Sequence, residues 1–449
     1  MKLKTVIKNV LLGSVAGLAM VGTAAAADLP VKAKAAEYVK ICSTYGAGFY
    51  YIPGTDTCLK VGGYVTADTY FTDIEGKTRV TVPGVSYRLD NDPDGQSYFL
   101  TRVGVQLDAR TQTEYGTLRS YFEGRFNAGE SYGFGQEIDT GEFSFSDGIR
   151  NSAEMKYGYI QFAGFTFGRA TSAFDFWAGD GWQGIQPGSF YSDVTLNVIQ
   201  YTADFGNGFS ATIALEDSYG REDEFANFEE LSGQQVPDIV GNIAYEGTWG
   251  AFKVSGAWHQ IGDWNPLVGP DFGNGPTSLF TSNDDSGWAV LAGVRFDFAE
   301  TTTLYVEGAY ASGAPGYLGL DGTIPVVDAF GRAVEGWYVG GSLIHYWTPS
   351  VFTTVVGSYT QSDNFAVGYD IDVNNNTNFT GVSSTDFTGY NVGVNIGWVP
   401  VKGLTLVLQY DYLNAEYSGS DFLYGNVTPI SYSQEAAQNR VTFSAKRSF

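Results

Sequence analysis

Apolar and polar residues alternate with a period of two along most of the chain, which predicts β-strands with one apolar and one polar face. In WAVLAGVRFDF, for example, Trp288 and Val294 share one face, and Arg295 and Asp297 lie on the other. The pattern occurs sixteen times. The predicted strands lie near 59–71, 101–110, 117–126, 153–162, 165–170, 194–204, 208–217, 238–247, 250–260, 288–298, 301–312, 333–347, 350–361, 391–398, 404–413 and 438–449.

The segments between these strands alternate strictly between short and long. The short ones include TQTEY, AG, FGN, TW, TPS and VPVKG. The long ones lie near 72–96, 129–152, 171–193, 218–237, 261–285, 313–332, 362–386 and 417–437. Short turns at one end, long loops at the other and an even strand number are typical of an outer-membrane β-barrel. A soluble β-sandwich is the alternative interpretation, but it gives no reason for this regularity.

A barrel also explains the two faces of the strands. In hydrocarbon every backbone N–H and C=O must be paired within the protein, and closing the sheet removes its edges. The apolar face then meets lipid and the polar face meets water inside, because sixteen strands enclose an aqueous lumen. The mean hydropathy of −0.11 excludes a helical membrane protein, which needs several apolar runs of about 20 residues.

The N-terminus predicts export. Lys2, Lys4 and Lys8 precede the apolar run VLLGSVAGLAM and the small residues of TAAAAD, so residues 1–26 read as a secretory signal peptide. An amphipathic helix of the mature fold is the alternative. Removing three lysines and no acids changes the net charge from −24 to −24 − 3 = −27. We expect two further parts, an N-terminal disulfide-closed segment (27–58) and the transmembrane barrel (59–449).

Charge and cysteine content narrow the class of protein. The acidity argues against nucleic acid as a partner and suits outer loops that meet divalent cations bound to anionic lipid such as lipopolysaccharide. Cys42 and Cys58 are the only cysteines, with no histidine nearby, so an exported chain is expected to join them in a disulfide rather than a metal site. Closing that loop stabilises the N-terminal region by about 3 kcal/mol.

Several segments carry a family resemblance. EYVKICSTYGAGFYYIPGTDTCLKVGGYV (Glu37 to Val65), GNGFSATIALED, VPDIVGNIAYEGTWG and the terminal RSF, ending in Phe449, resemble the alphaproteobacterial porin family. The resemblance implies a Gram-negative outer-membrane protein, a homotrimer of sixteen-stranded barrels for passive diffusion of ions and small hydrophilic solutes. It also implies that the third long loop folds into the lumen and narrows it.

The polar face of the 101–126 hairpin carries four arginines, which is unusual in so acidic a protein. Like charges this close repel by about 1 kcal/mol per pair at 4 Å in water. We interpret them as a basic wall at the constriction, opposite an acidic loop at about 171–193, so that a transverse field sets ion preference. The residues assigned to the wall are Arg102, Arg110, Arg119, Arg125 and Arg169, with Arg295 and Lys253 as weaker candidates, and those assigned to the loop are Asp175, Asp180 and Asp193.

Three alternatives stay open. The arginines could pair with Asp108 and Glu123 and only solvate the wall. Aromatic residues of the third loop could form a stacking surface, which would make a substrate-specific channel, for example for sugars; the simpler interpretation is that they anchor the loop. An enzyme is disfavoured because His259 and His345 have no recognisable Ser/Asp constellation, and no cofactor, metal spacing or catalytic residue is expected.

Overall fold

The computed structural model describes residues 40–82, 85–91, 95–133, 146–149, 151–177, 182–183, 190–218, 221, 235–261, 286–320, 324, 332–373, 377–424 and 431–449. The predicted signal peptide (1–26), the segment 27–39 and the predicted loop acid Asp180 lie outside the described residues. The compact unit Ile41–Phe449 contains every strand of the fold.

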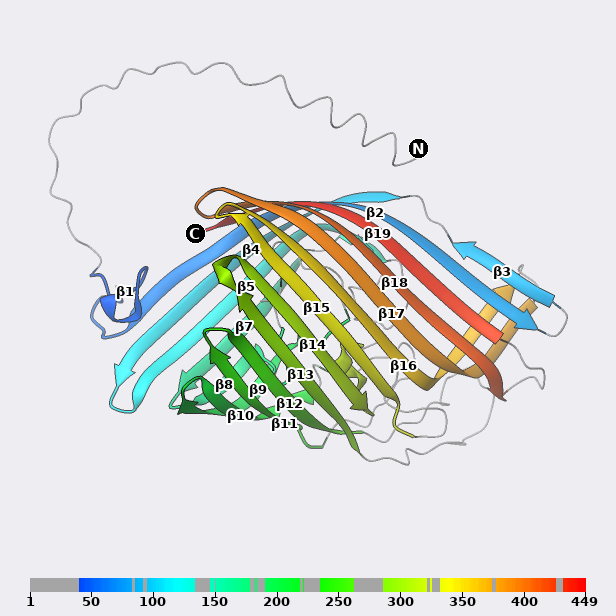
Figure 1. Cartoon of the computed structure of the whole chain (residues 1–449), viewed down its shortest axis with the longest axis horizontal. Helices are drawn as coiled ribbons and strands as arrows, with labels where there is room; N and C mark the ends of the chain where they lie inside the picture. The colour runs from blue at the N-terminus through cyan, green and yellow to red at the C-terminus, as the bar shows by residue number, and fades with distance from the viewer. Residues whose placement is uncertain are drawn as a thin grey trace, which may run out of the picture. The chain divides into compact units, whose positions relative to one another are not determined.

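One antiparallel sheet closes on itself to form a barrel (Figure 1). Of its nineteen strands, β1 (Tyr50–Tyr51), β3 (Val85–Asn91) and β6 (Ser146–Ile149) are short additions to β2 and β5, which leaves 19 − 3 = 16 in the wall. The barrel closes where β19 pairs with β2 from Ser431–Thr81 to Ser448–Tyr64. The predicted fold class is therefore confirmed. The wall strands are β2 (Cys58–Val82), β4 (Gln96–Thr113), β5 (Gly116–Gly133), β7 (Ser152–Phe162), β8 (Phe165–Thr171), β9 (Thr195–Gly206), β10 (Phe209–Glu216), β11 (Asp238–Gly247), β12 (Gly250–Gln260), β13 (Ser286–Phe298), β14 (Thr302–Ser312), β15 (Glu335–Thr348), β16 (Val351–Val373), β17 (Thr377–Val401), β18 (Leu404–Tyr424) and β19 (Ser431–Ser448).

Three of the predicted long loops are mostly strand. Within 362–386, β16 and β17 stay paired up to Val373 and Thr377, and 72–96 and 417–437 are likewise largely taken up by β2, β3, β18 and β19. The polar sequence of these segments suggested loops, but a hairpin that projects into water needs no apolar face, because ladder hydrogen bonds alone pair its backbone. Strand lengths were therefore underestimated, whereas strand number and order were not.

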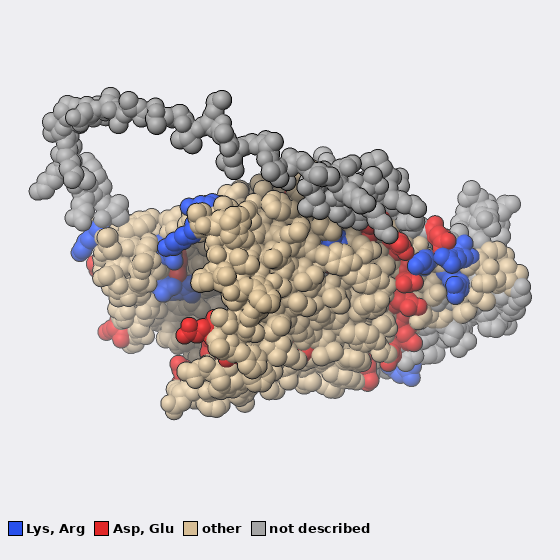
Figure 2. All heavy atoms as spheres, turned by 45° about the horizontal axis from the view of Figure 1, so that its top comes forward, with Lys and Arg blue, Asp and Glu red and all other residues tan. Residues whose placement is uncertain are grey.

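The outward face of the wall is apolar. Ile243, Val392, Ile396 and Leu408 are all more than half exposed on this face, as the alternation predicts. In Figure 2 a broad surface almost free of Lys, Arg, Asp and Glu lies between charged margins, as expected for a surface that meets lipid. Among the described residues, no helix is long and apolar enough to cross a membrane.

Parts of two loops pack inside the barrel. Phe174 of the third loop (172–194) and Tyr317, Leu318 and Leu320 of the sixth loop (313–334) form a buried core inside the barrel. The inner face of β11 to β14 makes room for this core with small inward side chains, namely Ala257, Ala289, Ala309 and Ala311. The described parts of the third and sixth loops therefore pack against the inner face of β12 to β14.

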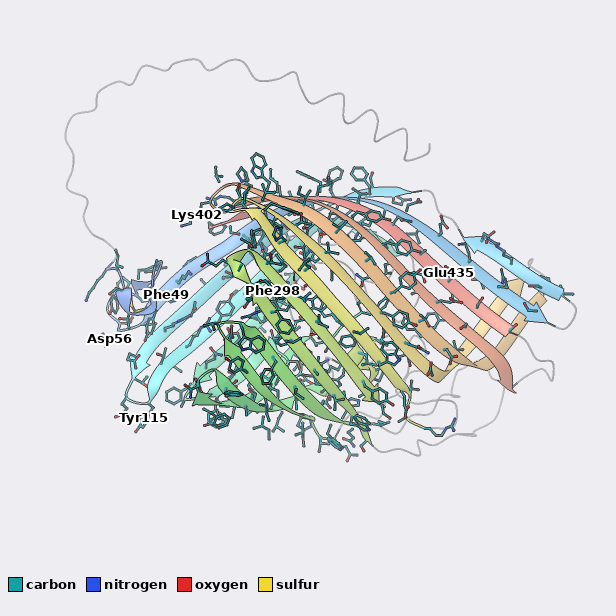
Figure 3. The ribbon with its side chains drawn as sticks, in the orientation of Figure 1. Phe49, Asp56, Tyr115, Phe298, Lys402 and Glu435 are labelled. Carbon is teal, nitrogen blue, oxygen red and sulfur yellow. A yellow bond between two sulfur atoms is a disulfide. The ribbon has the colours of Figure 1, made fainter. Side chains whose placement is uncertain are left out.

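The N-terminal segment forms a small disulfide-closed loop at the end of the barrel that carries the short turns. Cys42 and Cys58 form the predicted disulfide. Phe49 packs against both sulfur-bearing residues, and Ile52 N–H donates to the Thr57 carbonyl at 2.9 Å. Figure 3 places Phe49 beside the end of the barrel that carries Tyr115, with Glu435 towards the other end.

Candidate functional site

The β4–β5 hairpin presents its arginines to the lumen in a defined register. Arg110 pairs directly across from Arg119, next to the short turn. Arg102 pairs with Asn127, and Arg125 pairs with Gly104, so these two arginines are diagonal cross-strand neighbours further from the turn. The register therefore places Arg102 and Arg125 close together, and Arg110 and Arg119 nearer the short turn.

Carboxylates on the same wall neutralise most of this charge. Asp108 accepts two hydrogen bonds from Arg110, at 2.9 and 2.6 Å, and two from Arg119, at 3.0 and 3.1 Å. Arg125 donates to Glu123 at 2.8 Å. For these three arginines the structure thus shows the local pairing that the sequence left open as an alternative.

Arg102 is different. Its Nε donates to Asn127 Oδ1 at 2.6 Å, and among the described residues it has no carboxylate within 4 Å. Of the four hairpin arginines, Arg102 is therefore the one without an ion pair in the part of the chain that the structure describes.

Two lysines that the sequence did not single out join the basic wall. Lys446 lies on the lumen side of β19, exposed, 4.7 Å from the ring centroid of Tyr64. Lys156 is the extra residue of a β-bulge, because Glu123 pairs with Tyr157 while Gly124 pairs with Met155. A bulge redirects a side chain. The sequence contained a signal for this bulge. Met155 and Ile160 are both apolar and both face outward, although strict alternation would put an odd-numbered and an even-numbered residue on opposite faces.

Arg169 does not belong to this group. Strand parity places it on the same side of β8 as the exposed Phe165 and Phe167, and its Nε donates to the carbonyl of Met155 at 2.9 Å. We therefore leave Arg169 out of the lumen wall.

The weaker candidates also have local partners. Lys253 Nζ donates to the Asp175 carbonyl at 2.7 Å, so it holds the third loop. Arg295 pairs with Glu246 and Asp297, both at 3.1 Å, near a short turn.

Asp175 anchors the base of the third loop instead of facing the arginines. Its side chain is 0% exposed and accepts hydrogen bonds from Ser192 Oγ at 2.5 Å, Val194 N–H at 2.7 Å and Arg221 Nη2 at 3.0 Å. A carboxylate that is completely enclosed and paired contributes little field across the lumen. Its part in the structure is to close the loop on itself.

Arg221 joins three loops in one buried contact. Besides Asp175 it donates to Ser192 Oγ at 2.9 Å and to the carbonyl of Gly316 in the sixth loop at 3.0 Å, and its guanidinium lies 4.0 Å from the ring centroid of Tyr317. Burial alone would lower the pKa of Arg221, but the surrounding carboxylates, Asp175 first, raise it above its ordinary value. Sequence reasoning missed Arg221 because its partners are far away in the chain.

The remainder of the described third loop is fixed to the opposite wall by polar contacts. Trp177 N–H donates to Glu307 at 3.0 Å, Phe190 N–H donates to Ser358 Oγ at 2.9 Å, and the Ala173 carbonyl accepts from Asn242 at 2.6 Å. The loop aromatics Phe174 and Trp177 are 0% and 3% exposed. Phe174 and Trp177 therefore anchor the loop and offer no ring face to a solute, whereas Phe176, Trp182 and Phe190 are half-buried.

Of the two predicted loop acids among the described residues, Asp193 is the one that interacts with the basic wall. It is half-buried, and it interacts electrostatically with Lys156. The loop and the wall thus approach each other here with opposite charges.

The histidines take structural positions. His259 Nδ1 lies 2.9 Å from Asp238 Oδ1, and Tyr317 OH donates to Asp238 Oδ2 at 2.6 Å. His345 packs edge-on against Trp347, with ring centroids 4.5 Å apart, and lies 2.8 Å from Thr302 Oγ1. Within the described ranges, no group of three or more His, Cys, Asp or Glu residues is arranged to hold a metal ion.

The chain is similar to known proteins in both sequence and fold. The family model described as "Porin subfamily" matches residues 28–443. Porin Omp2a of Brucella ovis is 32% identical over 337 residues, 68% of this chain and 90% of that protein. Porin Omp2b of Brucella neotomae is 33% identical over 339 residues, covering 68% and 84%. The outer membrane channel DcaP of Acinetobacter baumannii has a similar fold, with a TM-score of 0.57 at 16% identity, covering 89% of this chain and 99% of that one.

Proposed function

The chain belongs to the porin subfamily and is an outer-membrane channel rather than an enzyme, and from this premise we propose how its constriction works. The channel passes ions and small hydrophilic solutes by passive diffusion. Its narrowest part lies between the third loop and a basic wall formed by Arg102, Arg125, Lys156 and Lys446. Asp193 supplies negative charge on the loop side, and Asp180 is a second candidate outside the described residues.

One observation carries the proposal. Three cations of this wall, Arg102, Lys156 and Lys446, have no carboxylate within 4 Å among the described residues, whereas Arg110 and Arg119 share Asp108. Cations that are crowded together without carboxylate partners repel one another, which costs free energy. A wall with only a structural role would therefore be expected to pair each cation with a carboxylate. Unpaired cations opposite an acidic loop produce a transverse field, which orients dipolar solutes and biases ion passage.

The proposal is tested by selectivity. We expect the variant Arg102→Gln/Arg125→Gln to shift the reversal potential across a salt gradient towards cation preference in planar bilayers. Lys402→Gln, in the exposed turn between β17 and β18, is the matched control and should leave the potential unchanged. An unaltered potential in the double variant would show that these side chains do not govern the narrowest part.

We further propose a homotrimer, which the family resemblance implies. The outward face of β2, β4 and β5 carries exposed Val61, Phe99 and Phe126, an apolar surface that suits a neighbouring subunit as well as lipid. Native mass spectrometry of the detergent-solubilised protein should give three times the subunit mass, with conductance steps in units of three. A monomeric mass with single steps would reject the trimer.

A further inference from the structure

We propose that the basic wall contains a binding site for small organic anions, in which Arg102 and Lys446 hold a carboxylate or phosphate group of a passing solute. The inference deepens the proposed constriction and rests on it, because it names the class of solute that the wall prefers. It adds saturable binding to a wall that would otherwise act only through its field.

The site is a single row across three strands. Lys446 of β19 pairs with Thr66 of β2, and Thr66 pairs with Arg102 of β4, so all three side chains point into the lumen at one level of the barrel. Neighbouring strands lie about 4.8 Å apart, which places the backbones of Lys446 and Arg102 about 10 Å from each other. Their long side chains can converge on one small anion across the short Thr66.

Both cations have donors to spare. Nε of Arg102 is engaged by Asn127, but within the described residues its two terminal nitrogens make no hydrogen bond. Lys446 Nζ lies over the Tyr64 ring, which attracts the ammonium but does not neutralise it or occupy its donors. An incoming anion therefore finds donors that no internal acceptor uses.

The ring beneath Lys446 is held firmly in place. Tyr64 OH donates to Glu123 at 3.2 Å. The ring lies against Gly104, where an added Cβ would come within 2.4 Å of it, so only glycine leaves room at that position. The wall thus supports Lys446 on a fixed aromatic surface, and this lowers the entropic cost of ordering the ammonium when an anion binds.

Elsewhere on the same wall, two arginines already hold a carboxylate of the protein itself. Three inward positions nearer the short turn of β4 and β5, Asp108 receives four hydrogen bonds from Arg110 and Arg119, at 2.6 to 3.1 Å. Between Arg102 and Lys446, Thr66 takes the corresponding place in β2. The carboxylate that interacts electrostatically with both cations is Asp68, which accepts a hydrogen bond from Ser444 Oγ rather than from either cation. A planar carboxylate or a phosphate suits a guanidinium because it can accept two parallel hydrogen bonds, which chloride cannot do.

A second contact is available along the wall. Lys156 Nζ lies 5.7 Å from the centroid of the Tyr157 ring and has no carboxylate within 4 Å among the described residues. Arg125 stands between Lys156 and Arg102, on β5. A solute whose first anionic group is held by Arg102 can therefore place a second one near Lys156, so we expect dianions to bind more tightly than monoanions.

The experiment measures block of the chloride current by succinate in planar bilayers. In the natural protein we expect a saturable reduction of current. Losing one charge-assisted hydrogen bond raises the half-saturating concentration about tenfold, which we expect for Arg102→Gln and Lys446→Gln. Lys402→Gln should behave as the natural protein does. Inorganic phosphate is the second probe, and whichever anion blocks at lower concentration identifies the preferred head group.

The outcomes separate this inference from the proposed constriction. If Arg102→Gln shifts the reversal potential but succinate block never saturates, or saturates equally in both variants, the binding site is refuted and the constriction stands. If Arg102→Gln changes neither the reversal potential nor the block, both proposals fail. Heat-modifiable migration in gels verifies that each variant forms a closed barrel before its currents are compared.

Discussion

Arg221 offers the sharpest test of how the constriction is held in place, because one side chain ties the third loop to the sixth. We consider its replacement by methionine, which keeps the length and removes the charge. The variant loses the hydrogen bonds to Ser192, Gly316 and Asp175 and the contact with the Tyr317 ring. It also leaves the Asp175 carboxylate buried without its cation.

The magnitude follows from complete burial. Both side chains of the Arg221–Asp175 pair are 0% exposed, so solvent does not screen their interaction. Removing one member of such a pair costs about 3–5 kcal/mol. That cost falls on loop attachment, since none of these contacts belongs to the strand ladders. The ratio of attached to detached third loop should therefore fall by roughly 10²- to 10⁴-fold.

Single-channel recording detects this change. We expect Arg221→Met to give a barrel that migrates normally in gels but shows large current fluctuations as the third loop leaves the wall and returns. The matched control is Arg295→Met, whose ion pairs with Glu246 and Asp297 are partly exposed and worth about 0–1 kcal/mol. The double variant Arg221→Met/Asp175→Asn has no uncompensated carboxylate. Its current should therefore fluctuate less than that of Arg221→Met. Quiet currents in Arg221→Met itself would refute the reasoning.

Two further predictions concern the disulfide and a wall glycine. The double variant Cys42→Ser/Cys58→Ser should destabilise the disulfide-closed N-terminal loop by about 3 kcal/mol. Limited proteolysis should then cleave within 43–57, while the conductance stays unchanged. If the variant resisted the protease as well as the natural protein does, the prediction would be wrong. Gly104→Val should displace the Tyr64 ring into the lumen at a cost of about 1–3 kcal/mol and lower single-channel conductance. Gly241→Val, where the nearest atom to an added Cβ is 3.8 Å away, is its control, and equal conductance in the two variants would count against the close fit of Tyr64 on Gly104.

Local sequence patterns determine much of the architecture. Period-two alternation sets which side of each strand faces lipid, and a slip by one residue would put every apolar side chain into water. Strand number, strand order, the short turns and the lumen position of Arg102 follow from that constraint alone. Strand ends were less accurate, because beyond the lipid both faces are polar and only backbone pairing extends β16 and β17 to Val373 and Thr377.

The details of the constriction depend on contacts that local patterns do not contain. Asp175 was predicted from its loop to face the arginines, yet Arg221, 46 residues away, draws it into a buried pair. Lys156 enters the lumen through a bulge, and Arg169 falls on the outer side of β8. The sequence by itself therefore determined the barrel, its two faces and the disulfide partners, since alternation and a single cysteine pair leave few choices. Only the tertiary structure decided which charges remain unpaired, because neutralisation depends on the distance between side chains that different loops and strands bring together.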